Sequence, residues 1–205
     1  GPDRGVSLIE LLTVMAILGI VLALAIPAAG QLMKASGMAN AGDQVLAALS
    51  TARQTAMARN RTVEVRFYKL TEATDPAGAR FHAMQSFVLE PGPQGTTTNA
   101  AGRIVSLPST TYLIDTPTLS SLLDASVSGR QTGATLAHAL PGVGLNYEAA
   151  AFRFFPDGST SLTSTNPLFV TIVSANTPDT TSDVPANFAT VVVQPANGKA
   201  KLHRP

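Results

Sequence analysis

An apolar stretch runs from Leu8 to Ala29 and contains a single charged residue, Glu10. As a helix it would be roughly 33 Å long, which is enough to cross the hydrocarbon core of a bilayer. A carboxylate inside such a segment costs at least a few kcal/mol unless it has a partner. The sequence therefore predicts a membrane-crossing helix in which Glu10 pairs with a cation.

The residues from Gly5 to Glu10 read Gly-Val-Ser-Leu-Ile-Glu, directly before the rest of the apolar run. This order resembles the N-terminal signature of the type IV prepilin family. The resemblance implies that a prepilin peptidase cuts between Gly5 and Val6 and methylates the new Val6 amine. It also implies that Glu10 brings a new subunit into register by pairing with a terminal amine in the growing filament. Two residues depart from the family pattern: Val6 replaces the usual Phe, and Asp3 lies beside the basic Arg4.

The alternative interpretation of the N-terminus is an ordinary signal anchor or a secretory signal peptide. The apolar run is longer than the roughly 7 to 15 residues of a secretory core. A plain anchor gains nothing from a buried Glu10, so the prepilin interpretation is favoured. Arg4 and Lys34 flank the run and give no local charge bias for orientation. The resemblance implies a cytoplasmic N-terminus, a single pass through the bacterial inner membrane and an exported remainder that later enters a pilus or pseudopilus.

Length and composition suit one helix followed by one domain. The chain has 205 residues and a formal net charge of +1, so no overall field points to nucleic acid. It has no cysteine, which excludes disulfides and thiolate chemistry. We divide the chain into a leader remnant at 1–5, a transmembrane and filament-core helix at 6–30, an amphipathic second half at 31–60 and an exported β domain at 61–205.

The helix is predicted to bend at Pro27, because proline removes one hydrogen bond and its ring clashes with the preceding turn. After the bend, apolar residues recur every three or four positions and predict a buried stripe. The stripe comprises Val45, Leu46, Leu49, Ala52, Ala56 and Met57. The opposite face is predicted to be solvated, with Gln44, Thr51, Gln54 and Thr55.

Two further segments resemble the GspH/FimT-type minor subunits of type II secretion pseudopili and type IV pili. The first is the Leu-x-x-Ala-Arg-x-x-Ala helix end that starts at Leu49, and the second is the Phe-x-Phe-x-Pro-x-Gly hairpin from Phe152 to Gly158. The segment from Arg59 to Leu70 also resembles the Verru_Chthon cassette protein D group. For the helix-end arginines, the simpler interpretation is a solvated helix terminus whose cations suit the helix dipole.

From Val63 to Phe67 the apolar period changes to two, which predicts a strand with one buried and one polar face. Further predicted strands are 84–89, 103–107, 111–114, 149–155, 159–162, 168–173, 188–193 and 199–202. The strand at 168–173 is apolar on both faces and is predicted to lie inside the sheet. The expected fold class is α+β, with a long N-terminal transmembrane and assembly helix packed on an antiparallel β-sheet domain, as in type IV pilins.

The connections show two kinds of signal. Turn residues occur at Pro156 to Gly158 and at Asn197–Gly198, and Thr116 is predicted to cap a short helix that reaches Asp124. Long connections at 91–102, 126–144 and 174–187 are predicted to be functional or disordered.

No catalytic constellation can be assembled from the sequence, so no enzyme and no cofactor are expected. His82, His138 and His203 lie in unrelated stretches, and no metal site is expected. Asp157, Asp179 and Asp183 could bind calcium in loops, but solvated loop acids are the favoured interpretation because no Asp-x-Asp-x-Asp pattern is present.

The C-terminus is the only basic cluster, with Lys199, Lys201 and Arg204. Gly198-Lys-Ala-Lys faintly resembles the Gly-Arg-x-Arg end with which some FimT-type pilins bind DNA. The favoured interpretation is an edge strand whose lysines prevent edge-to-edge pairing. The expected function is thus a minor pilin or pseudopilin near a filament tip, with a DNA-uptake pilin as the alternative. Its expected partners are a prepilin peptidase, other pilin subunits and the inner membrane.

Overall fold

The structure is a computed structural model that describes residues 7–71, 78–93, 95–181 and 183–205; for 24–35 it describes the backbone without the side chains. The chain forms two compact units, Gly1–Ser36 and Gly37–Pro205. Helix α1 (Leu8–Arg59) begins in the first unit and ends in the second. Each unit is described by itself below.

Helix α1 ends in a Schellman motif. Asn60 has a left-handed φ of 50°, and its N–H donates to the Met57 carbonyl at 3.4 Å. The N–H of Arg61 donates to the Ala56 carbonyl at 3.1 Å. These two bonds satisfy carbonyls that a helix end otherwise leaves unpaired, and they turn the chain directly into the first strand.

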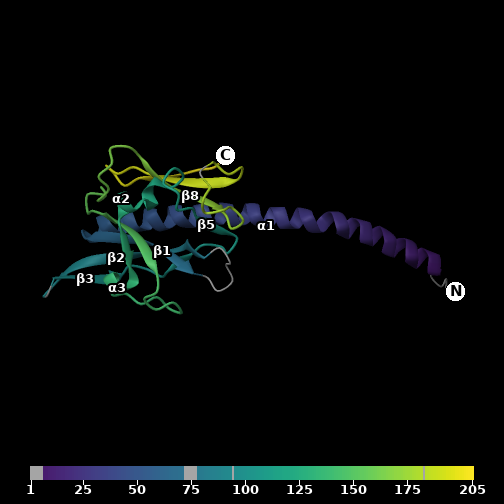
Figure 1. Ribbon diagram of the computed structural model, residues 1–205, viewed down its shortest axis with the longest axis horizontal. Helices are drawn as coiled ribbons and strands as arrows, with labels where there is room; N and C mark the ends of the chain where they lie inside the picture. The colour runs from purple at the N-terminus through teal and green to yellow at the C-terminus, as the bar shows by residue number, and fades with distance from the viewer. Residues whose placement is uncertain (1–6, 72–77, 94, 182) are drawn as a thin grey trace. The chain divides into compact units, whose positions relative to one another are not determined.

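The part of α1 in the second unit lies against the sheet (Figure 1). It buries one stripe of side chains in the hydrophobic core. The buried members are Met38, Ala41, Val45, Leu49, Ala52 and Ala56. The predicted stripe is thus correct except for Met57, which is 45% exposed at the last turn, and for Leu46, which is half-buried. Gly42 belongs to the buried face, because a Cβ there would lie 3.0 Å from the Leu202 side chain.

The second unit is built around one antiparallel sheet of order β10-β9-β8-β5-β2-β1-β7-β6, with β3 and β4 also paired to β2. The strands are β1 (Thr62–Thr71), β2 (Ala79–Gly92), β3 (Gly95–Ala100), β4 (Val105–Ser106), β5 (Thr111–Leu113), β6 (Arg130–Thr132), β7 (Glu148–Phe154), β8 (Leu168–Ser174), β9 (Phe188–Val193) and β10 (Ala200–His203). Short helical segments are η1 (Ser121–Leu123), α2 (Ala125–Ser128) and α3 (Gly133–Leu136). The predicted α+β class with an antiparallel sheet is confirmed.

The face of the first strand that was predicted to be polar does carry polar side chains, but it is covered and buried. Tyr68 on β1 is fully buried and meets Tyr147 edge-on at 5.2 Å. The segment that contains α3 folds over this face, where the Tyr147 hydroxyl donates to the His138 carbonyl at 2.6 Å. Burial raises the pKa of Tyr68 well above its ordinary value, so its hydroxyl stays protonated. The 126–144 connection therefore contributes to a second hydrophobic cluster, through buried Leu140 and the partly buried Leu136 and Val143.

Three local predictions are wrong. Residues 159–162 form no strand but only one bridge, from Thr160 to Phe154, because the Thr160 hydroxyl and N–H both donate to the Pro195 carbonyl. The 91–102 connection contains the end of β2 and all of β3. Thr116 does not cap a helix, since its hydroxyl donates to the carbonyls of Asp179 and Thr181. Asp124 is the N-cap instead, accepting from the Ser126 N–H ahead of α2.

Candidate assembly site

The start of α1 is closed by a capping box between Ser7 and Glu10. The Ser7 N–H donates to the Glu10 carboxylate at 2.9 Å, and the Glu10 N–H donates to the Ser7 hydroxyl at 3.4 Å. This reciprocal pair satisfies two backbone donors that a helix N-terminus otherwise leaves free. The carboxylate also lies where the helix dipole favours negative charge. Glu10 therefore has a local partner within its own chain.

Helix α1 presents large apolar side chains to its surroundings after the capping box. Leu8 is 84% exposed, and every described side chain from Leu8 to Ala23 is exposed. The hydroxyl of Thr13 donates to the Ile9 carbonyl at 2.7 Å, so the helix satisfies its own polar side chain. A contiguous exposed apolar surface of this size marks a site of interaction with another protein or a membrane.

Among the side chains that the structure describes, no helical stretch is both long enough and apolar enough to span a membrane.

The predicted processing residues, Gly5 and Val6, lie outside the described residues. Helix α1 runs through Pro27, whose side chain is also outside them, and the bend at that position stays a prediction. The cation predicted to pair with Glu10 stays a prediction as well. Of the predicted N-terminal site residues, the structure thus gives side-chain geometry for Glu10 alone.

The two segments that resemble the GspH/FimT pattern meet at the end of α1. The Arg53 Nε donates to the Asn197 carbonyl at 2.8 Å, so Arg53 is a structural contact as well as a helix-end cation. Gly158, in the turn after β7, has φ +84° and packs so closely on Arg53 that a Cβ would lie 2.9 Å from its Nη2. Gly198 in turn packs against Gly158 and Phe154. The helix end and both predicted turns thus form one junction.

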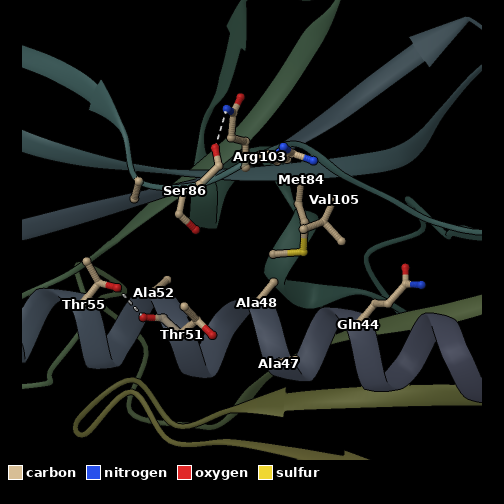
Figure 2. A pocket seen from close by; sticks show the side chains of 13 residues that line it. Gln44, Ala47, Ala48, Thr51, Ala52, Thr55, Met84, Ser86, Arg103 and Val105 are labelled. Carbon is tan, nitrogen blue, oxygen red and sulfur yellow. Dashed lines mark hydrogen bonds between the residues drawn. The ribbon is translucent and has the colours of Figure 1, made fainter.

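Beside the helix lies an open groove of about 390 Å³, formed by α1, β2 and the segment after β3 (Figure 2). Small side chains of α1 form one wall, including Ala48, Thr51 and Thr55. Met84 points from β2 toward the helix, with Val105 beside it. Because Gln44, Thr51 and Thr55 line this groove, the helix face predicted to be simply solvated is one wall of a concave, mostly apolar surface.

The basic C-terminal residues are divided between two environments. Lys199 and Lys201 are exposed, in the turn before β10 and on β10 itself. Arg204 donates to the Asp43 carboxylate at 2.7 Å and to the Ala39 carbonyl at 3.1 Å on α1. Because Arg204 is paired with Asp43, it is not available as a third free cation beside the two lysines.

The candidate metal ligands lie apart. Asp157 accepts from the N–H and hydroxyl of Ser159, and these bonds hold the pKa of Asp157 below its ordinary value. Asp179 forms an ion pair with Arg80 at 2.9 Å. Within the described part of the chain, no three His, Cys, Asp or Glu side chains gather in a way that could hold a metal ion.

Comparison with known sequences identifies the N-terminus. Residues 2–26 match the family model described as the prokaryotic N-terminal methylation motif. A search of curated proteins gives no match. The matched residues include the capping box and all the described exposed side chains from Leu8 to Ala23, so the motif and the described helix start coincide.

Solved structures with a similar arrangement are minor pilins and pseudopilins. The type IV minor pilin FimU of Pseudomonas aeruginosa is 13% identical, with a TM-score of 0.43, covering 82% of this chain and 92% of that one. The minor pseudopilin EpsH from the Type 2 Secretion System of Vibrio cholerae is 12% identical, with a TM-score of 0.43, covering 82% and 97%. At this similarity the matches assign no role to any residue of this chain.

Proposed function

We propose that this chain, a pilin-like structural subunit with a prepilin-type N-terminal motif rather than an enzyme, is cut after Gly5, methylated on Val6 and assembled through its N-terminal helix into a type II secretion pseudopilus or a type IV pilus. The observation that carries the proposal is the ordered motif over residues 2–26. The capped Glu10 and the exposed apolar helix that follows it are what such an assembly needs.

The driving force for assembly would be burial of the apolar side chains from Leu8 onward against neighbouring helices. Burying one leucine or isoleucine side chain fully contributes roughly 1.5–3 kcal/mol relative to exposure in water. Glu10 would supply specificity, because it follows the new amine at Val6 by four residues in the sequence and its carboxylate would pair with a terminal amine of a neighbouring subunit. In the separate subunit, the Ser7 N–H holds this carboxylate.

Before assembly, we place the segment 6–30 in the bacterial inner membrane as a single pass, with a cytoplasmic N-terminus. Residues 31–60 would then form the amphipathic half of the helix and 61–205 the exported domain. The partners would be a prepilin peptidase that also methylates Val6, and other pilin or pseudopilin subunits. A position near the filament tip fits the GspH/FimT-like segments around Arg53 and Gly158.

Substituting Gly5 tests the processing step. Co-expressed with a prepilin peptidase, the native chain is expected to begin at an N-methylated Val6, whereas Gly5→Val is expected to stay uncut because a branched side chain replaces the motif glycine. Intact mass and N-terminal sequencing measure both outcomes.

The matched control is Gly19→Ala, since a Cβ at Gly19 meets nothing within 4 Å and the substitution stays inside the same apolar helix. This variant is expected to be cut and methylated like the native chain. An uncut native chain, with the same peptidase active on another prepilin, would reject the proposal and leave a membrane anchor.

The alternative function is DNA binding by the basic C-terminus, and the exposure of Lys199 and Lys201 is its support. Because Arg204 is held by Asp43, two cations are available, so the slope of log affinity against log salt for duplex DNA is expected to be no steeper than about −2. Gel shift of the full chain in detergent, beside a Lys199→Gln/Lys201→Gln variant, measures this. No retention of the native chain at low salt rejects the alternative, as does equal retention of the variant.

A further inference from the structure

Strand β3 is the outer strand of a hairpin with β2, and it is exposed along its whole length (Figure 1). All six of its residues are exposed, and its sequence, Gly-Thr-Thr-Thr-Asn-Ala, has no charge and no proline. Among the described strands it pairs with β2 alone. Its other edge therefore offers unpaired backbone groups, which are a template for another strand.

The register shows which groups of β3 are available. The Ala101 N–H donates to the Ser86 carbonyl, and hydrogen-bonded pairs alternate along an antiparallel ladder. With Phe87 opposite Ala100 and Val88 opposite Asn99, the groups of Thr97 and Asn99 face β2. The N–H and C=O groups of Thr96, Thr98 and Ala100 consequently point away from it.

Other exposed edges of the sheet are blocked or short. In the same hairpin, Pro91 lies opposite Thr96 in a pair that makes no hydrogen bond, so its missing N–H is on the far edge of β2. Edge strand β10 carries Lys201, a charge that disfavours pairing, and edge strand β6 has only three residues. Among these described edges, only β3 has none of the features that prevent strand addition.

We propose that β3 is a contact surface for a second copy of this chain, whose β3 adds in antiparallel orientation with Thr98 opposite Thr98. This register uses every outward-facing backbone group of the strand, since Thr96 then lies opposite Ala100. It sets no like charges against each other, and threonine pairs across a strand are favourable. The sheets of two subunits become continuous through their hairpins, independently of the N-terminal helix and of processing.

Disulfide trapping tests both the contact and its register, because the native chain has no cysteine. In the proposed register the two Thr98 Cα atoms are about 5.5 Å apart, within the range that a disulfide bridges. The full chain in detergent micelles with Thr98→Cys, treated with a mild oxidant, is therefore expected to form a disulfide dimer on a non-reducing gel. A mixture of Thr96→Cys and Ala100→Cys chains is expected to form the mixed dimer.

Two controls separate pairing from collision. Thr163 is exposed like Thr98 but lies in a loop, so Thr163→Cys is expected to give several-fold less dimer than Thr98→Cys. Thr96→Cys alone is also expected to give little, since in this register the two Thr96 residues are roughly 14 Å apart along the strands. Dimer yields for Thr98→Cys no higher than for Thr163→Cys, or a Thr96→Cys yield equal to that of the mixture, would overturn the proposal.

Discussion

Replacing Glu64 with alanine is expected to lower the free energy of unfolding by about 3–5 kcal/mol, because it leaves a buried arginine without its anion. Glu64 and Arg66 lie on the same face of β1, and their carboxylate and Nε are 2.7 Å apart with both side chains about 5% exposed. The second carboxylate oxygen accepts from the Arg153 Nε at 2.9 Å. The Arg66 guanidinium also stacks over the Phe87 ring at 4.3 Å, and Arg66 is 4% exposed.

Urea unfolding of the full chain in detergent, followed by tyrosine fluorescence, measures this loss. The double variant Glu64→Leu/Arg66→Met is expected to recover most of it, because apolar side chains of similar volume need no partner. Asp43→Asn breaks an exposed ion pair with Arg204 and is expected to cost at most about 1 kcal/mol. A Glu64→Ala cost as small as that of Asp43→Asn would mean that water reaches Arg66 and that this face is not closed.

The same network explains what the sequence could not predict about the sheet. Alternation from Val63 to Phe67 correctly identifies the face that packs on α1, because aliphatic side chains repeat there at period two. Glu64 and Arg66 indicate a solvated face by the same rule, yet both are 4% exposed. The cover comes from a segment whose apolar residues, such as Leu140, follow no helical or strand period. Because the covering segment is aperiodic, the sequence contains no pattern from which the burial of Glu64 and Arg66 could be predicted.

The candidate site shows a different limit. The ordered motif from Gly5 to Glu10 suffices to predict the N-terminal segment, and the family match covers it. The capping box was not predicted, although its signature, Ser7-x-x-Glu10 before an apolar run, is present in the sequence. The contact between Arg53 and the Asn197 carbonyl could not be predicted, since it joins residues 144 positions apart through a backbone acceptor that any residue supplies. Strand β3 was missed because threonines without apolar neighbours resemble a loop.

A side chain at Gly198 is expected to destabilise the chain by roughly 2–5 kcal/mol, since it adds a left-handed backbone penalty to a steric one. Gly198 has φ +62°, and a Cβ there would lie 2.5 Å from the Gly158 carbonyl oxygen and 2.9 Å from the Phe154 ring. Neither neighbour can move alone. Gly158 packs on Arg53, and Arg53 holds the carbonyl of Asn197, the residue before Gly198. A shift at one turn therefore loosens the helix end and the β7 turn together.

Gly144→Ala is the control, because Gly144 has a similar φ, +69°, but a Cβ there meets nothing within 4 Å. It should show the left-handed backbone penalty alone, roughly 1–2 kcal/mol. Urea midpoints of Gly198→Ala and Gly144→Ala, compared with the native chain, therefore separate conformational strain from contact. If the junction joins helix and turns as described, Arg53→Ala should add little to the cost of Gly198→Ala. The reason is that Gly198→Ala already breaks the contact that Arg53→Ala removes. Equal costs for the two glycine variants would show that the turn can open without disturbing α1, and that the junction is not a rigid unit.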